Sequence, residues 1–97
     1  MKLQNLHEVK YVGAKNLDSV MSYVNDDATI ESGFIMRIKR HYDNTIQPVF
    51  AVSVQHDEDD GSPFVVVTFF DRQDDSDIFE PDDFVKAVEI HSTKRVL

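Results

Sequence analysis

The sequence predicts a single α+β domain over residues 1–97, an antiparallel sheet of about four strands with two helices in the order β-α-β-β-β-α. Two periodicities predict this class, because some segments place apolar residues at every second position and others at every third or fourth. A chain of 97 residues is long enough for one modest core and too short for two. Its 41% of hydrophobic residues, seven Phe among them, exclude a compositionally disordered chain.

The first third of the chain predicts a strand and a helix. In residues 6–12, Val9 and Tyr11 lie on one face of a period of two, which is typical of a half-buried strand, and Gly13 ends it. Asn16 then offers a side-chain cap for a short amphipathic helix. The apolar face of this helix follows the spacing i, i+3, i+4, i+7 and consists of Leu17, Val20, Met21 and Val24.

The middle of the chain predicts a β-hairpin. Residues 34–40 alternate with a period of two after Gly33, and the outer face of this strand is basic. The polar run between 42 and 48 favours a turn, and residues 49–54 are rich in strand formers. We therefore expect the two strands to pair as antiparallel neighbours. The basic strip on the first strand consists of Arg37, Lys39 and Arg40.

A third strand and a second helix complete the predicted fold. Residues 64–70 are apolar on both faces, so we expect this strand to be central or covered by a helix. Pro81, followed by Asp82 and Asp83, favours a helix over 81–91, whereas the alternative makes 88–91 a last strand. The residues expected in the core are Leu17, Ile38, Phe50, Val52, Phe64, Val66, Val67 and Phe69.

Acidic residues are concentrated in one segment of the chain. Residues 57–83 carry eleven carboxylates and a single base, Arg72, for a net charge of −10, while the remainder sums to +2 and the whole chain to −8. We expect these carboxylates to form the partner-binding surface. They are Asp57, Glu58, Asp59, Asp60, Asp71, Asp74, Asp75, Asp77, Glu80, Asp82 and Asp83.

The acids flank the strand predicted at 64–70, so they form either a band along one edge of the sheet or two separate poles. One interpretation is a solubilising coat, because solvated carboxylates are screened over a Debye length of ~8–10 Å. Two observations favour a binding surface. Asp, the shorter and stiffer carboxylate, outnumbers Glu by thirteen to five, and apolar residues at 63–64 and 78–79 lie beside the acids.

Motifs for catalysis, metal binding and cofactor binding are not found. The absence of Cys excludes disulfides and thiol nucleophiles, and the four His lack metal-site spacing. Residues 57–61 resemble half of a calcium loop, but with Gly61 at position 6 the required positions 1 and 12 fall on His56 and Val67. We therefore expect no enzyme activity, no metal and no cofactor.

The partner is suggested by the sign of the charge. A net charge of −8 repels phosphates, so direct binding to nucleic acid is not expected. The same charge suits a basic nucleic-acid-binding protein whose groove accepts carboxylates in place of phosphates. No apolar window approaches the roughly 20 residues of a membrane helix, so we expect a soluble cytoplasmic protein without a membrane partner.

The acidic layout resembles a family of inhibitors. The stretches HDEDDG, DRQDDSD and EPDD surround the strand PFVVVTFF, and this charge pattern and size are similar to those of the DNA-mimic proteins that phages use against restriction, repair or CRISPR enzymes. The resemblance covers residues 57–83 and implies a non-enzymatic inhibitor that competes for a DNA- or RNA-binding groove, often as a homodimer. Two alternatives stay open: a scaffold domain that docks through an apolar sheet surface, and a small acid-base enzyme using His56 beside Asp57 and Asp59.

Overall fold

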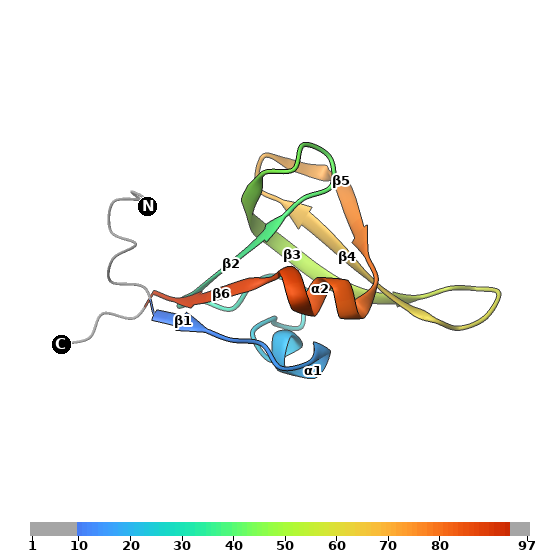
Figure 1. Cartoon of the computed structure of the whole chain (residues 1–97), viewed down its shortest axis with the longest axis horizontal. Helices are drawn as coiled ribbons and strands as arrows, with labels where there is room; N and C mark the ends of the chain where they lie inside the picture. Colours follow the sequence, from blue (N-terminus) through green and yellow to red (C-terminus); the bar gives the residue numbers. More distant parts are fainter. Residues whose placement is uncertain (1–9, 94–97) are drawn as a thin grey trace.

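Six antiparallel strands and two short helices make up residues 10–93, the part of the chain that the computed structural model describes (Figure 1). The predicted α+β class is confirmed, and the sheet order is β1-β6-β2-β3-β4-β5. Residues 6–9 of the first predicted strand lie outside the described range. The elements are β1 (Lys10–Val12), α1 (Leu17–Met21), β2 (Phe34–Lys39), β3 (Ile46–His56), β4 (Pro63–Phe69), β5 (Arg72–Phe79), α2 (Pro81–Ala87) and β6 (Glu89–Ser92).

Strand β3 belongs to both halves of the sheet. Its first residues pair with β2, where Pro48 lies opposite Arg37, which confirms the predicted hairpin. From Val49 onward β3 pairs with β4 instead, with a register shift between Val49 and Ala51. Such a bulge bends the strand. The hairpin of β3 and β4 then projects well beyond α2, with residues 57–62 at its tip (Figure 1).

The core is formed by one face of the sheet together with the two helices. Strand β4 alternates along its length, so that Val65 and Val67 are fully buried while Phe64 and Val66 are half-buried on the other face. The expectation that Phe50, Phe64 and Val66 are buried is therefore wrong, because no element of residues 10–93 covers the outer face as α2 covers the inner one. Leu17 on α1 packs against the core but is only half-buried, so that expectation is also wrong. The buried apolar residues are Val20, Met36, Ile38, Val49, Val52, Val65, Val67, Phe69, Phe79, Phe84, Val88 and Ile90.

Both helices begin where the sequence predicts and end earlier. The Asn16 side chain accepts a hydrogen bond of 2.9 Å from the Ser19 amide, which confirms the cap of α1. Helix α2 begins at Pro81 but stops at Ala87, and the expected extension to 91 is wrong. The alternative strand is correct as β6, because burial of Val88 and Ile90 follows a period of two. No helix within residues 10–93 is long and apolar enough to cross a membrane.

Strand β5 occupies an acidic segment for which the sequence predicted no strand. It pairs with β4 at Arg72 and from Ser76 to Phe79, with a register shift that leaves 73–75 without a partner in β4, and it forms one edge of the sheet. Phe79 is buried at its end, and the Asp77 side chain is only 17% exposed, so this carboxylate points inward. Charges on an edge strand, inward-pointing ones included, oppose pairing with the edge of another molecule. The acids of this segment therefore have a structural role besides any function.

Candidate functional site

The eleven acids fall into two groups. Strand β5 runs back along β4, with Arg72 opposite Phe69 at one end and Phe79 opposite Val65 at the other. The first group, which we call the β5 group, lies on β5 and in the turn before it and consists of Asp71, Asp74, Asp75 and Asp77. The second group lies at the tip of the β3–β4 hairpin and at the start of α2, so the eleven acids do not form one continuous band along the edge strand.

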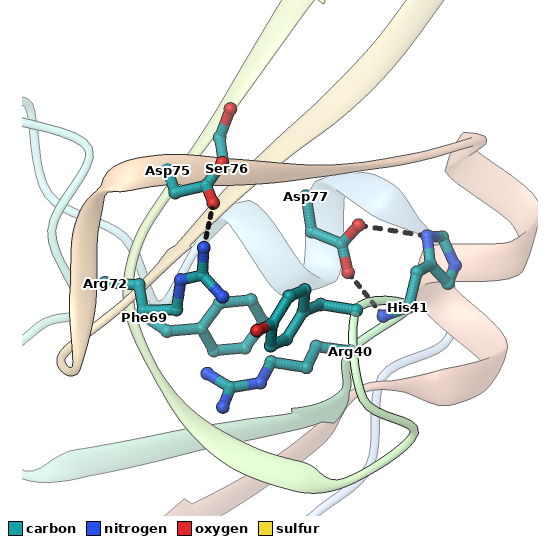
Figure 2. A pocket seen from close by; sticks show the side chains of 8 residues that line it. Arg40, His41, Phe69, Arg72, Asp75, Ser76 and Asp77 are labelled. Atoms are coloured by element: carbon teal, nitrogen blue, oxygen red, sulfur yellow. Dashed lines mark hydrogen bonds and ion pairs between the residues drawn. The ribbon is translucent and has the colours of Figure 1, made fainter.

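Three acids of the β5 group have a partner side chain within the fold. Asp71 accepts a hydrogen bond of 2.8 Å from Arg40, and Asp75 forms an ion pair of 2.6 Å with Arg72. Asp77 accepts from the backbone amide of His41 at 2.7 Å and lies 3.1 Å from the ring Nδ1 (Figure 2). Asp71 and Asp77 thereby join β5 and the turn before it to the turn after β2, whereas the Asp75–Arg72 pair lies within β5.

A pocket of about 310 Å³ lies between that turn and β5 (Figure 2). The Arg72 guanidinium stacks on Tyr42 at 4.0 Å from the ring centre, and that of Arg40 lies 5.3 Å from the centre of the Phe69 ring. Its wall contains three basic side chains that each lie against a carboxylate of the fold: Arg40, His41 and Arg72. These groups therefore already have a partner. The prediction of Arg40 on an exposed basic strip is wrong, since its side chain is 8% exposed.

Three acids of the second group line a second concavity, which we call the acidic cleft. It has a volume of about 440 Å³ and lies between the tip of the β3–β4 hairpin and the first turn of α2. Phe64 is half-buried and supplies an apolar wall. The carboxylate at position 80 precedes α2 without forming a side-chain cap and stays exposed. The cleft is lined by Asp57, Ser62, Pro63, Phe64, Glu80, Pro81 and Asp82.

Unlike Asp71, Asp75 and Asp77, the seven acids at the hairpin tip and the start of α2 have no cationic partner within residues 10–93. No ion pair within residues 10–93 involves any of the seven, and all seven are exposed. Carboxylates so placed attract Lys and Arg side chains of another molecule. The seven are Asp57, Glu58, Asp59, Asp60 at the hairpin tip and Glu80, Asp82, Asp83 at the start of α2.

Turn chemistry accounts for the preference for Asp at the hairpin tip. Asp57 Oδ1 accepts a hydrogen bond from the Asp59 amide at 2.8 Å, and Asp60 Oδ1 accepts from the Ser62 amide and hydroxyl at 2.8 and 2.7 Å. The Ser62 hydroxyl thereby lowers the pKa of Asp60. Asp is suited to this role because its short side chain reaches the backbone two residues ahead. The loop therefore fixes the positions of Asp57 and Asp60 through hydrogen bonds to its own backbone.

Metal binding and acid-base catalysis both require side chains held close together. Among residues 10–93 no three acidic or histidine side chains come close enough to hold a metal ion. His56 is exposed, and its ring accepts or donates no hydrogen bond within this part of the chain. The chemistry that the acidic cleft offers is thus attraction of cationic groups beside an apolar wall.

The cluster around Arg40 was missed by sequence reasoning. Arg40 and Asp43 are three residues apart in a turn, a spacing that permits a side-chain pair, and this was the one local signal. Asp71 lies 31 residues away from Arg40 and had no signal at all. No family model matches the chain, and no curated protein or solved structure is similar to it.

Proposed function

We propose that this chain is a small non-enzymatic interaction protein that inhibits a basic nucleic-acid-binding protein by occupying its groove. The acidic cleft and the hairpin tip make the contact, and their carboxylates take the places of phosphates. The observation that carries the proposal is the difference between the two sets of acids. Three acids of the β5 group, Asp71, Asp75 and Asp77, each lie against Arg40, Arg72 or His41, whereas the seven at the cleft are exposed and form no ion pair within residues 10–93.

The geometry of the hairpin supports this function. The protein as a whole measures 50 × 26 × 23 Å along its principal axes. The hairpin projects from the rest of the fold, so its tip can enter a groove (Figure 1). Like charges held together repel one another, and cations of a partner relieve that repulsion. Phe64 and Pro63 add apolar contact beside the charges. Both features match a groove that is basic and partly apolar.

The test compares two variants that each lose four negative charges. The cleft variant carries Glu58→Gln, Asp59→Asn, Asp82→Asn and Asp83→Asn, none of whose side chains accepts a hydrogen bond within residues 10–93. The matched control carries Asp18→Asn, Asp26→Asn, Asp27→Asn and Glu31→Gln, which are exposed and lie in or after α1. Because both variants lose the same net charge, a difference in binding between them reports a local contact of the cleft and not the effect of net charge.

Proteins captured by the immobilised wild type are identified by mass spectrometry and then assayed for binding to their own nucleic acid. We expect the wild type to inhibit that binding, less so as salt rises. Losing two charge-assisted pairs weakens inhibition by about two to four orders of magnitude in the cleft variant. The control should inhibit like the wild type. Equal inhibition by both variants would assign the acids to solubility and remove the proposal.

A second candidate function is docking of an accessory or scaffold domain through apolar surface. Ile78 on β5 is 56% exposed and lies opposite the half-buried Val66, so the outer face of the sheet carries an uncovered apolar patch there. Docking through this patch would be nearly independent of salt, and Ile78→Ser would abolish it. The salt series above therefore distinguishes the two functions.

A further inference from the structure

A groove of about 620 Å³ lies between β2, the start of β3 and the segment that precedes β2. It shares no lining residue with the acidic cleft. Its walls are mainly apolar, and its volume falls within the ~300–1,000 Å³ typical of sites for small molecules. The apolar residues that matter here are Ile30, Phe34, Ile35, Pro48, Phe50 and Phe70.

One wall of the groove is built by the bulge in β3. Phe50 sits at this bulge, between Val49 and Ala51, and its ring packs edge-to-face on that of Phe70 with the ring centres 5.3 Å apart. Phe70 follows β4 and remains 58% exposed. Bulges redirect side chains, and here the redirection brings the ring of Phe50 on β3 against that of Phe70, just after β4, on an open surface.

Two charged side chains line the groove, Arg37 and the exposed Glu31, and they form no ion pair with each other. Arg37 is half-buried, and its guanidinium forms no hydrogen bond or ion pair within residues 10–93. The contrast with Arg40 and Arg72 is direct, because both of these are held by carboxylates. A guanidinium that has lost part of its water beside apolar walls gains from an anion that it can bind through two hydrogen bonds.

We propose that this groove binds a small amphipathic carboxylate, with its aliphatic or aromatic chain against Phe50 and Phe70 and its carboxylate on Arg37. The planar fork of an arginine matches a carboxylate. A single negative charge is favoured over a polyanion because the whole chain carries −8 and repels further negative charge. This inference is independent of the proposed function, since it concerns a different surface and a different class of ligand.

Decanoate serves as the probe, titrated into the ¹⁵N-labelled protein and followed by amide chemical shifts. Decanol, with the same chain and no charge, and acetate, with the charge and no chain, are the reference ligands. We expect saturable shifts of the Ile35, Phe50 and Phe70 amides with decanoate, binding at least about tenfold weaker with decanol, and none with acetate. Absence of saturable binding by decanoate, or shifts confined to other residues, would overturn the proposal.

Arg37→Met keeps the apolar stem of the side chain and removes its charge. It should weaken decanoate binding by about 10- to 100-fold while decanol binding stays unchanged. Lys39→Met is the matched control, because Lys39 is exposed two residues further along β2 and does not line the groove. Arg37→Gln is the second variant in case the first fails to fold. The proposal of a site for small carboxylates would be contradicted if the Arg37 variants bound decanoate as tightly as the wild type. It would also be contradicted if Lys39→Met lost as much affinity as they did, or if an apolar peptide bound more tightly than decanoate.

Discussion

Arg40 donates a hydrogen bond of 2.8 Å to Asp71 and so connects the turn after β2 to the turn between β4 and β5. The same guanidinium donates to both carboxylate oxygens of Asp43, at 3.0 and 2.8 Å. These hydrogen bonds from Arg40 lower the pKa of both carboxyl groups. His41, the next residue, adds a second link through Asp77 (Figure 2). The edge strand β5 is thus held to the β2–β3 hairpin by ionic contacts.

Arg40→Met should lower the melting temperature at neutral pH by several degrees. The substitution leaves Asp43 and Asp71 without their donor and removes the contact of the guanidinium with Phe69. Arg37→Met is the control, since it removes an arginine of the neighbouring strand that has no ionic partner within residues 10–93. Thermal unfolding followed by circular dichroism measures both. Equal melting temperatures of the two variants would show that the Arg40 contacts contribute nothing to stability.

The contribution of Arg40 should disappear in acid. The pKa values of Asp43 and Asp71 in the folded protein lie below the ordinary value of 3.8, so the unfolded chain binds more protons at low pH. The stability from these groups is therefore complete above about pH 5 and is lost as pH falls through 3.8 and below. The melting temperatures of the wild type and Arg40→Met should converge between pH 5 and pH 2. A difference that stays constant over this range would rule out the carboxylates as its source.

Adjacent valines of β4 should respond oppositely to the same substitution. Val67 is fully buried among core residues, whereas Val66 is half-buried on the uncovered face. Val67→Asp places an unpaired charge in the core and should unfold the domain, because such changes exceed ~4–5 kcal/mol, close to the whole stability of many domains. Val66→Asp should remain folded and cooperative. Amide spectra of the two variants decide, and unfolding of both would show that the outer face is covered.

The accuracy of sequence reasoning depended on how local the decisive contacts were. The cap at Asn16, the start of α2 at Pro81 and the β2–β3 hairpin follow from neighbouring residues and were predictable. Strand β5 was not, because Asp-rich segments have low strand propensity and its pairing depends on β4. Composition identified every acid of the site, but it did not distinguish paired from unpaired acids. That distinction rests on contacts such as Arg40 with Asp71, 31 residues apart.

The acids of β5 should keep the protein from associating through its edge. Asp74 is exposed on this edge strand and forms no ion pair within residues 10–93. Asp74→Val should preserve the fold while promoting concentration-dependent association, because an uncharged, strand-forming edge is a template for pairing. Light scattering over a range of concentrations measures this, with Asp26→Val in a loop as the control. Unchanged scattering of Asp74→Val would mean that the paired acids Asp75 and Asp77 suffice to protect the edge.

The hairpin tip should be removable without loss of the fold. Its backbone closes on itself, since the Asp57 amide donates to the Ser62 carbonyl and the Gly61 amide to the Asp57 carbonyl, both at 2.9 Å. Replacing residues 57–62 with Asn-Gly would join His56 directly to Pro63, its partner across the hairpin, by a two-residue turn. The first buried residue of β4 is Val65, which the replacement leaves in place. The melting temperature should therefore change by only a few degrees.

This shortened protein tests the proposed function more severely than neutralisation does, because it removes the projecting tip together with four carboxylates. It should fail to inhibit the partner at any salt concentration, whereas the four-charge control in the α1 region, which retains the tip, should inhibit like the wild type. Competition assays with the partner's own nucleic acid measure the difference. Full inhibition by the shortened protein would place the contact at the start of α2 or on the apolar face of the sheet, and the hairpin would then have no part in recognition.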